Sequence, residues 1–267
     1  MERRGNMLVT HKLPWNKCLS HQLMPAIEKG WKDEDKPIHF FWGLAGKNIH
    51  DITMCEAQGE EWWYVDVGYL TEQITRYPEP IINNYDKTYF RICKGGIHTT
   101  KLKECDSKRL NVEFKGWQSG EHILVCPSSP TVTFHINGIS QEEWINKTIN
   151  EIKNCTDRPI RLRNKPRPGN KWWNTNILDD LKGAHCLVTN MSLSAVDAII
   201  NGVPCITDKK NVANFVSNQE INYKSLNYPF KPDNKEINKW MRMLTHNQFT
   251  IREIEDGIAF KVLQEQI

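Results

Sequence analysis

A pair of serines placed just after a predicted strand is the feature of this chain best suited to bind phosphate. Ser192 and Ser194 follow the apolar run 186–189 within five residues. Ser194 can cap a helix, with Asp197 three residues further on as in a capping box. The N–H groups and the dipole of such a helix start attract anions. The pattern predicts a phosphate site, although an ordinary capped helix would explain the serines equally well.

A cluster of cations lies earlier in the chain, and its members are Arg158, Arg161, Arg163, Lys165 and Arg167. Arg161, Arg163 and Lys165 alternate with the period of a strand, which places them on one face. Arginine pairs bidentately with phosphate, and a departing nucleoside diphosphate gains negative charge as its bond breaks. We therefore predict a diphosphate-binding strand, with an exposed basic edge strand or a polyanion site as the alternatives.

Two residues at strand ends in the first half of the chain are candidate general bases. Asp66 lies at the end of the run 62–67, and His98 follows the run 88–93. A carboxylate or an imidazole can take the proton of an acceptor hydroxyl. We expect Asp66 to serve first and His98 second. The alternatives are that Asp66 braces the turn before Gly68 and that His98 is structural.

Several loop residues are predicted to contact ligands. Glycines in the segment WGLAGKN let a backbone approach a ligand closely, although the spacing matches neither dinucleotide nor Walker motifs. Ser128 and Ser129 form the corresponding turn of the second half, where they contact a diphosphate or simply stabilise the turn. The candidates on the acceptor side are Gly43, Gly46, Lys47, Tyr69, Arg91 and Lys94.

Aromatic pairs could stack on a base or a sugar. Trp172 and Trp173 lie in a predicted loop beside the cationic cluster, which makes them better candidates than Trp62 and Trp63 in a predicted strand. No two histidines or cysteines have the spacing of a zinc site, and no DxD pair follows a strand. We therefore expect neither a bound metal nor a bound cofactor.

The elements that must position these residues alternate between strand and helix. Strands are expected at 7–10, 38–42 and 62–67, with helices at 19–31 and 49–58, a pattern typical of a parallel sheet. An irregular segment, 68–115, carries one further strand. The alternation then restarts, with strands at 122–126, 159–163, 186–189 and 204–207 and helices at 141–154, 175–182, 194–201, 235–245 and 251–266.

This restart predicts an α/β protein with two Rossmann-like lobes, residues 1–118 and 119–267, with a cleft between them and C-terminal helices that pack back. A formal net charge of +3 argues against a strongly basic nucleic-acid clamp. No run approaches 18 apolar residues, and the first residues lack a signal-peptide pattern, so we expect an unexported, cytoplasmic protein without a membrane partner. Eight cysteines without a CxxC pair are expected to be reduced thiols.

The segment TNMSLSAVDAIINGVPCIT resembles the part of GT-B-fold glycosyltransferases in which a serine-containing loop opens a helix ending in EAL.GKPV, with Gly202 after the helix. The succession WGLAGKN, WWYVDVGYL, YFRICKGGIH, ILVCPSSP and TDRPIRLRNKP is similar to small glycosyltransferase-like proteins of bacteriophages and proteobacteria. The resemblance implies that the second lobe binds a nucleotide-sugar donor, of UDP type, and that its sugar passes to an acceptor hydroxyl.

Phage enzymes of this kind are suspected of decorating hydroxylated or hydroxymethylated bases, so the same likeness implies a pyrimidine of double-stranded DNA as acceptor and the host cytoplasm as location. Fold-level likeness does not itself name a substrate. Two alternatives stay open at this point. One is a nucleotide-sugar epimerase or hydrolase on the same fold, and the other is a nucleic-acid-binding protein without catalysis.

Overall fold

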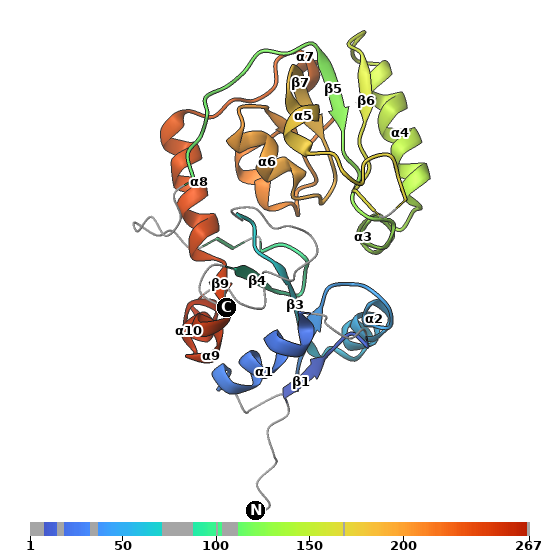
Figure 1. Ribbon diagram of the computed structural model, residues 1–267. Helices are drawn as coiled ribbons and strands as arrows, with labels where there is room; N and C mark the ends of the chain where they lie inside the picture. The colour runs from blue at the N-terminus through green and yellow to red at the C-terminus, as the bar shows by residue number, and fades with distance from the viewer. Residues whose placement is uncertain are drawn as a thin grey trace, which may run out of the picture. The chain divides into compact units, whose positions relative to one another are not determined.

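The computed structural model describes residues 8–14, 19–32, 37–70, 88–99, 101–102, 112–167 and 169–265. The chain forms two compact units (Figure 1), one made of Met1–Leu110 with Arg242–Ile267 and the other of Asn111–Met241. Among the described residues, each unit has its own sheet with helices around it, five-stranded in unit 1 and four-stranded in unit 2. The prediction of an α/β fold with parallel strands is confirmed.

The sheet of unit 1 begins as predicted and then changes direction. Its parallel part consists of β1 (Leu8–His11), β2 (Ile38–Trp42) and β3 (Glu61–Val67), joined through α1 (Ser20–Gly30) and α2 (Asn48–Gln58). The next strand, β4 (Tyr89–Lys94), runs antiparallel to β3. The carboxyl end of β4 therefore lies beside the amino end of β3, where a parallel strand would have its amino end.

Period-two alternation assigns the two faces of this sheet. One face carries Phe40, Trp63 and Val65, which form a buried core with side chains of α1 and of the C-terminal helices. The other face carries His39 and Phe41. Such alternation lets one sheet bury a helix layer on each side.

The C-terminal tail belongs to unit 1. Here β9 (Phe249–Thr250) pairs with β4, and α9 (Ile251–Glu255) and α10 (Ile258–Gln264) follow it. The expected boundary placed this tail with the second lobe, because its two-residue strand leaves almost no periodic signal in the sequence. The expected single helix over 251–266 is broken at Gly257, which adopts a φ of 73°. Close packing also requires Gly30, since a Cβ there would lie 1.7 Å from the carbonyl oxygen of Ile254.

Unit 2 has an all-parallel sheet in the order β6-β5-β7-β8. The strands are β5 (His122–Val125), β6 (Ile160–Leu162), β7 (Ala184–Val188) and β8 (Cys205–Ile206), and every strand was predicted within two residues. The strand residues of β5 are fully buried, as the run of apolar residues indicates.

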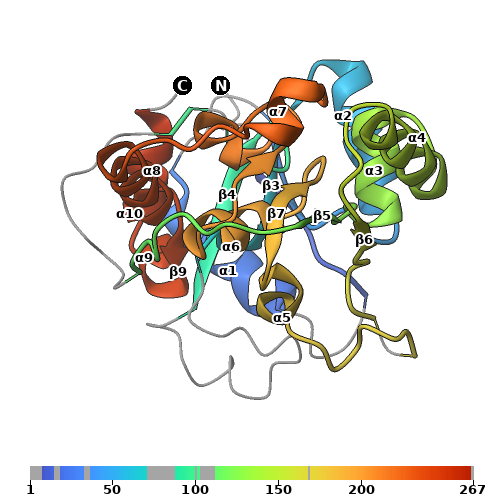
Figure 2. The ribbon, with the colours of Figure 1, turned by 90° about the horizontal axis from the view of Figure 1, so that it is seen from above.

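The helices of unit 2 connect these strands. The structure contains the predicted helices α4 (Gln141–Lys153), α5 (Ile177–Leu181), α6 (Ser194–Ile200) and α8 (Asn234–His246). The last residues of α8 belong to unit 1. A capping box of Ser140 and Glu143 begins α4, a start that the spacing of a serine and a glutamate three residues apart favours. The sequence did not indicate α3 (Pro130–Asn137), α7 (Tyr223–Asn227) or the 3-10 turn η2 (Val212–Val216). Figures 1 and 2 show α3 and α4 side by side near β6.

Six cysteines lie in the described part of the chain, and all are free thiols. Burial raises the pKa of the Cys126 thiol to about 12, which keeps it protonated and unreactive. Cys18 and Cys105 lie outside the described residues. Among the helices described, none is both long and apolar enough to cross a membrane.

Candidate functional site

The strand order of unit 2 creates a switch point between β5 and β7. The chain leaves β5 for β6 on one side of it and later returns to β7 on the other side. In an open parallel sheet, ligands bind outside the carboxyl ends of the strands where the order reverses in this way. The loops after β5 and β7 therefore form the candidate ligand site. The parallel strands of unit 1 follow one another in chain order, so its described part has no such point.

Ser128 and Asn190 lock these two loops together. The backbone N–H of Ser128 donates to Asn190 Oδ1 at 3.0 Å, and Ser128 Oγ accepts from the backbone N–H of Met191 at 3.0 Å. The Asn190 amide donates in turn to Asn137 Oδ1 at 2.9 Å, at the end of α3. Ser128 and Asn190 are both buried. Ser128 therefore holds the two loops in position, and its side chain is too buried to contact a ligand.

A third loop is tied into the same network. Asn211, which follows β8 and is fully buried, donates to the carbonyl oxygens of Asn190 and Ser192 at 2.9 and 3.3 Å. Its own Oδ1 accepts from the N–H of Ala213. The loops after β5, β7 and β8 are thus held by side-chain amides, so that the polar groups at their surface have fixed positions.

The helix start after β7 differs from its prediction. The expected cap, Ser194, is the first helical residue of α6, and no side chain caps this helix. Instead Ser192 Oγ accepts from the N–H of Ser194 at 3.2 Å. The helix therefore begins one residue earlier than a cap at Ser194 would give, and Asn211 and Ser128 hold the preceding residues in the loop. Asp197 is exposed on the first turn and is not part of a capping box there.

Ser129 caps the neighbouring helix. Its Oγ accepts from the N–H of Val132 at 3.5 Å, at the start of the eight-residue helix α3, and the residue is half-buried. Pro130 at the first helical position suits this start, because it needs no hydrogen-bond partner. Ser129 and Ser192 are thus the predicted donor-site serines that reach the surface at the switch point.

Arg163 is placed near the switch point but is already used by the protein. Its guanidinium is buried, donates to Asp180, and also contacts the Thr175 hydroxyl and carbonyl at 2.9 and 3.1 Å. A buried guanidinium with these partners cannot also be a free phosphate ligand. The prediction that Arg163 binds the diphosphate is corrected on this point, since a sequence pattern does not show a carboxylate 17 residues away.

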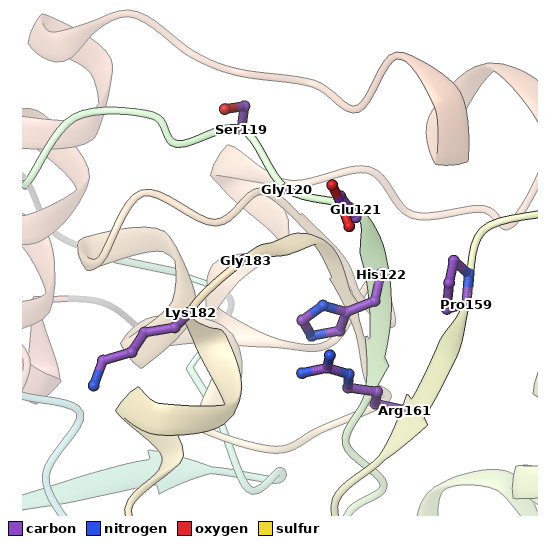
Figure 3. A pocket seen from close by; sticks show the side chains of 8 residues that line it. All are labelled: Ser119, Gly120, Glu121, His122, Pro159, Arg161, Lys182 and Gly183. Carbon is purple, nitrogen blue, oxygen red and sulfur yellow. The ribbon is translucent and has the colours of Figure 1, made fainter.

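Arg161 points elsewhere. It lines a pocket of about 520 Å³ at the amino ends of the strands, together with His122, Pro159 and Gly183. Figure 3 shows the His122 and Arg161 side chains next to each other, with that of Lys182 directed away. Burial and the charge of Arg161 lower the pKa of His122 below 6.5. This edge lies opposite the switch point, so Arg161 is not part of the predicted one-faced cationic strand.

Exposed cations do follow the flanking strands. Lys165 and Arg167 come after β6, and Lys209 and Lys210 come after β8. Because β6 and β8 flank β5 and β7, these loops lie on either side of the switch point. Lys165 was predicted from the sequence, whereas Lys209 and Lys210 were missed, although two lysines directly after a buried strand would have been a usable signal.

The tryptophan pair lies in the turn that precedes α5. Trp172 and Trp173 are half-buried, and the ammonium of Lys171 lies 4.6 Å from the centre of the Trp172 ring. The carbonyl of Trp172 accepts from Thr175, which also contacts Arg163. The backbone of Trp172 is thus linked through Thr175 to Arg163 of the cationic segment.

In unit 1, Asp66 forms the centre of a polar cluster. Its carboxylate accepts from the Tyr64 hydroxyl at 2.5 Å, from the N–H of Val67 at 2.8 Å, and from the buried guanidinium of Arg91 at 3.1 Å. Burial and the charge of Asp66 raise the pKa of Tyr64 well above 10, so the phenol stays a donor. Arg91 also donates to the carbonyls of Ile97 and Val67, which makes it a brace and not an exposed acceptor contact.

His98 and Tyr69, two of the acceptor-side candidates, lie side by side. The two rings meet edge to face, with centroids 5.9 Å apart, and both side chains are buried. Burial, with the charge of Arg91, holds the pKa of His98 well below 6.5. Tyr69 accepts from the N–H of Thr99 at 3.1 Å and contacts the Cys93 thiol. These positions fit a supporting role better than contact with a substrate.

The remaining acceptor-side candidates lie at two different edges of the sheet of unit 1. Lys94 lies at the opposite edge from Asp66, because β4 is antiparallel, and there it pairs with Glu61 at 2.6 Å. Gly43 and Gly46 both adopt a φ of 62°, in the loop at the carboxyl end of β2. Lys47 is exposed and pairs with Asp51. The glycine loop therefore stays at the expected edge, and Lys94 does not.

No family model and no curated protein matches the chain. Among solved structures, the chain is similar to Thermosulfurimonas dismutans KpsC, a beta Kdo 2,7 transferase, at 12% sequence identity with a TM-score of 0.44. The similarity covers 95% of this chain and 99% of that one. A likeness at this distance does not assign a substrate or a site residue.

Proposed function

We propose that the chain is a glycosyltransferase that binds a nucleotide-sugar donor at the switch point of unit 2. The observation that carries the proposal is the position of the serine loops: residues 126–129 and 189–193 follow adjacent parallel strands on either side of the point where the strand order reverses. Nucleotide ligands bind at this place in open α/β sheets.

The chemistry of the loops suits a diphosphate. Ser129 and Ser192 offer hydroxyls at the surface, and the exposed cations of the flanking loops, Lys165, Lys209 and Lys210, offer positive charge. Because the Asn190 network fixes the loops, these groups need little reorganisation to stabilise the charge that develops on a leaving diphosphate. Arg163 supports the site through Asp180 and Thr175 and does not contact the donor.

The assignment to sugar transfer, and not to another nucleotide reaction, draws on the resemblance of residues 189–207 to the donor segment of GT-B enzymes. On this proposal the two units are the two GT-B lobes, unit 2 takes a donor of UDP type, and unit 1 takes the acceptor. Asp66 is the proposed base, because about a third of its side chain is exposed while Tyr64 and Arg91 orient it.

A hydroxylated or hydroxymethylated pyrimidine in phage DNA is the acceptor that we propose. Within a duplex such a base would have to rotate out of the stack. This acceptor draws on the sequence resemblance alone.

The test is mass spectrometry of hydroxymethylated DNA, with unmodified DNA as the control, after incubation with the protein and a panel of sugar nucleotides. We expect a mass gain of one sugar on the modified base, and its loss in Asp66→Asn. A donor that changes without any acceptor would favour the epimerase or hydrolase. DNA binding without any change in donor or DNA would favour the non-catalytic alternative, and either result would contradict the proposal.

A further inference from the structure

A group of metal-ligating side chains gathers in unit 1, at the edge of the sheet opposite Asp66. His39 lies at the start of β2, Cys55 in the last turn of α2, and Glu60 directly before β3. One ligand atom from each of the three lies within 4.8 Å of the others, and His39 Nε2 is 3.2 Å from Glu60 Oε2. No described residue of the proposed donor site takes part.

Local structure brings these three residues together. Gly59 ends α2 with a φ of 68°, and this turn lets the N–H of Glu60 donate to the carbonyl of Cys55 at 2.9 Å. The parallel register of β2 and β3 pairs His39 with Trp62, which places Glu60 close to His39. The ligand atoms thus come from a helix end and two strand starts, all of which the fold holds in place.

The His11 side chain supports the imidazole of His39 from its other ring nitrogen. His11 Nε2 lies 3.0 Å from His39 Nδ1, and His11 Nδ1 lies 3.6 Å from Asp51 Oδ2. His11 also stacks on Phe41, with ring centroids 3.9 Å apart. Metal-bound histidines have this kind of partner on their second nitrogen, which fixes the ring and its tautomer.

The contact with His11 decides which nitrogen of His39 can bind an ion. His11 Nε2 meets His39 Nδ1, and His39 Nε2 is the nitrogen that faces Glu60. In the tautomer in which His39 Nδ1–H donates to His11, the lone pair of Nε2 is available to a metal ion that also contacts the Glu60 carboxylate and the Cys55 sulfur.

We propose that His39, Cys55 and Glu60 bind one Zn²⁺ ion, with water as the fourth ligand. Nitrogen, sulfur and carboxylate donors together suit zinc and argue against Mg²⁺ or Ca²⁺. On binding, the Cys55 thiol releases its proton to solvent as the Zn–S bond forms. Because the site lies at the amino edge of the sheet, away from the ligand-binding edge, the ion stabilises the packing of α2 on unit 1 and takes no part in transfer.

The test is titration of untagged, EDTA-treated protein with Co²⁺, which reports a thiolate ligand through a near-ultraviolet charge-transfer band, followed by displacement with Zn²⁺. We expect one equivalent of Co²⁺ to produce the band and Zn²⁺ to abolish it. Cys55→Ser should lose the band. Glu60→Gln keeps the Cys55 thiol and changes a partly exposed side chain. This variant should bind Co²⁺ with affinity reduced by more than the roughly 10–100-fold that is typical when only a hydrogen-bond partner of a metal ligand is changed.

His11→Gln should reduce the affinity for Co²⁺ by about 10–100-fold, because His11 orients the His39 imidazole without binding the ion itself. Matched controls are Cys155→Ser, a half-buried thiol of unit 2, and His21→Gln, an exposed histidine of α1, and both should titrate like the parent. The absence of a band at stoichiometric Co²⁺, its persistence in Cys55→Ser, or unchanged affinity in Glu60→Gln would overturn the site. These readouts do not depend on transferase activity, so the donor site can fail while this one stands.

Discussion

The N–H of Ser128 donates to the side chain of Asn190 at 3.0 Å, although the two residues are 62 positions apart in the chain. This bond, with the return contact from Met191 to Ser128 Oγ, joins the two loops at the switch point of unit 2. The geometry of the proposed donor site therefore depends on a buried asparagine that no phosphate motif would single out.

Replacing Asn190 by Ala should leave the buried N–H of Ser128 without an acceptor. An unsatisfied buried donor costs about 1–3 kcal/mol, so the free energy of unfolding should fall by that amount in urea denaturation. Asn146→Ala, on the exposed face of α4, is the matched control and should change little. A loss below about 0.5 kcal/mol in Asn190→Ala, the range of ordinary surface substitutions, would argue against this network.

Arg163→Ala should lower stability because it leaves Asp180 without its partner. Breaking a fully buried pair costs about 3–5 kcal/mol, and we expect about 2 kcal/mol here because a third of the Asp180 side chain is exposed. Arg163→Ala with Asp180→Ala should cost less than the sum of the two single changes in a double-mutant cycle. Strictly additive losses would be inconsistent with a coupled pair. Lys165→Ala, exposed on the same segment, is the control.

The buried His98 predicts a loss of stability in acid. Burial, with Arg91 beside it, holds its folded-state pKa well below 6.5, so below that pH the unfolded chain binds a proton that the folded chain does not. Stability from this residue is present above pH 6.5 and falls as the pH drops. His98→Gln should remove up to about 1.4 kcal/mol per pH unit of that dependence in unfolding measured between about pH 7 and 5, with the full slope reached at the acid end. An unchanged slope would contradict the burial of His98, and His21→Gln supplies the control.

Gly202→Ala should destabilise unit 2 for two reasons. Gly202 has a φ of 82°, and a Cβ there would lie 1.9 Å from the carbonyl oxygen of Gly116. Gly169 has a φ of 84° but nothing within 4 Å of its Cβ position, so Gly169→Ala reports the backbone strain alone. We expect about 1 kcal/mol for Gly169→Ala and at least about 2 kcal/mol more for Gly202→Ala in thermal or urea unfolding. Equal losses would show that the close approach to Gly116 has no energetic effect.

Strand and helix periodicity predicted most elements because unit 2 buries both faces of a parallel sheet, and its strands then read as continuous apolar runs. Because both residues follow predicted parallel strands, the sequence also placed Ser128 and Ser192 at the same edge of the unit 2 sheet. It could not show that β4 is antiparallel, which moved Lys94 to the opposite edge. Nor could it show Asp180 beside Arg163, since an ion pair across an element leaves no local pattern.

The site residues that sequence reasoning missed are those with structural partners far away in the chain. Asn190 was not singled out within the segment TNMSLSAVDAIINGVPCIT, yet it is the residue that joins three loops. A polar side chain that directly follows a buried strand at a switch point was the available signal. His39, Cys55 and Glu60 lack the spacing of a zinc motif because a helix and two strands bring them together.

Calorimetric titration of the protein with UDP shows whether the switch point of unit 2 binds a nucleoside diphosphate. We predict one UDP per chain and an affinity reduced at least about tenfold by Lys209→Ala combined with Lys210→Ala, since hydrogen bonds to charged groups contribute about 1.5–3 kcal/mol. Both lysines are exposed, so the fold should be unaffected, and Lys147→Ala on α4 is the matched control. No heat of binding at millimolar UDP, or equal affinity in the double variant, would contradict the account.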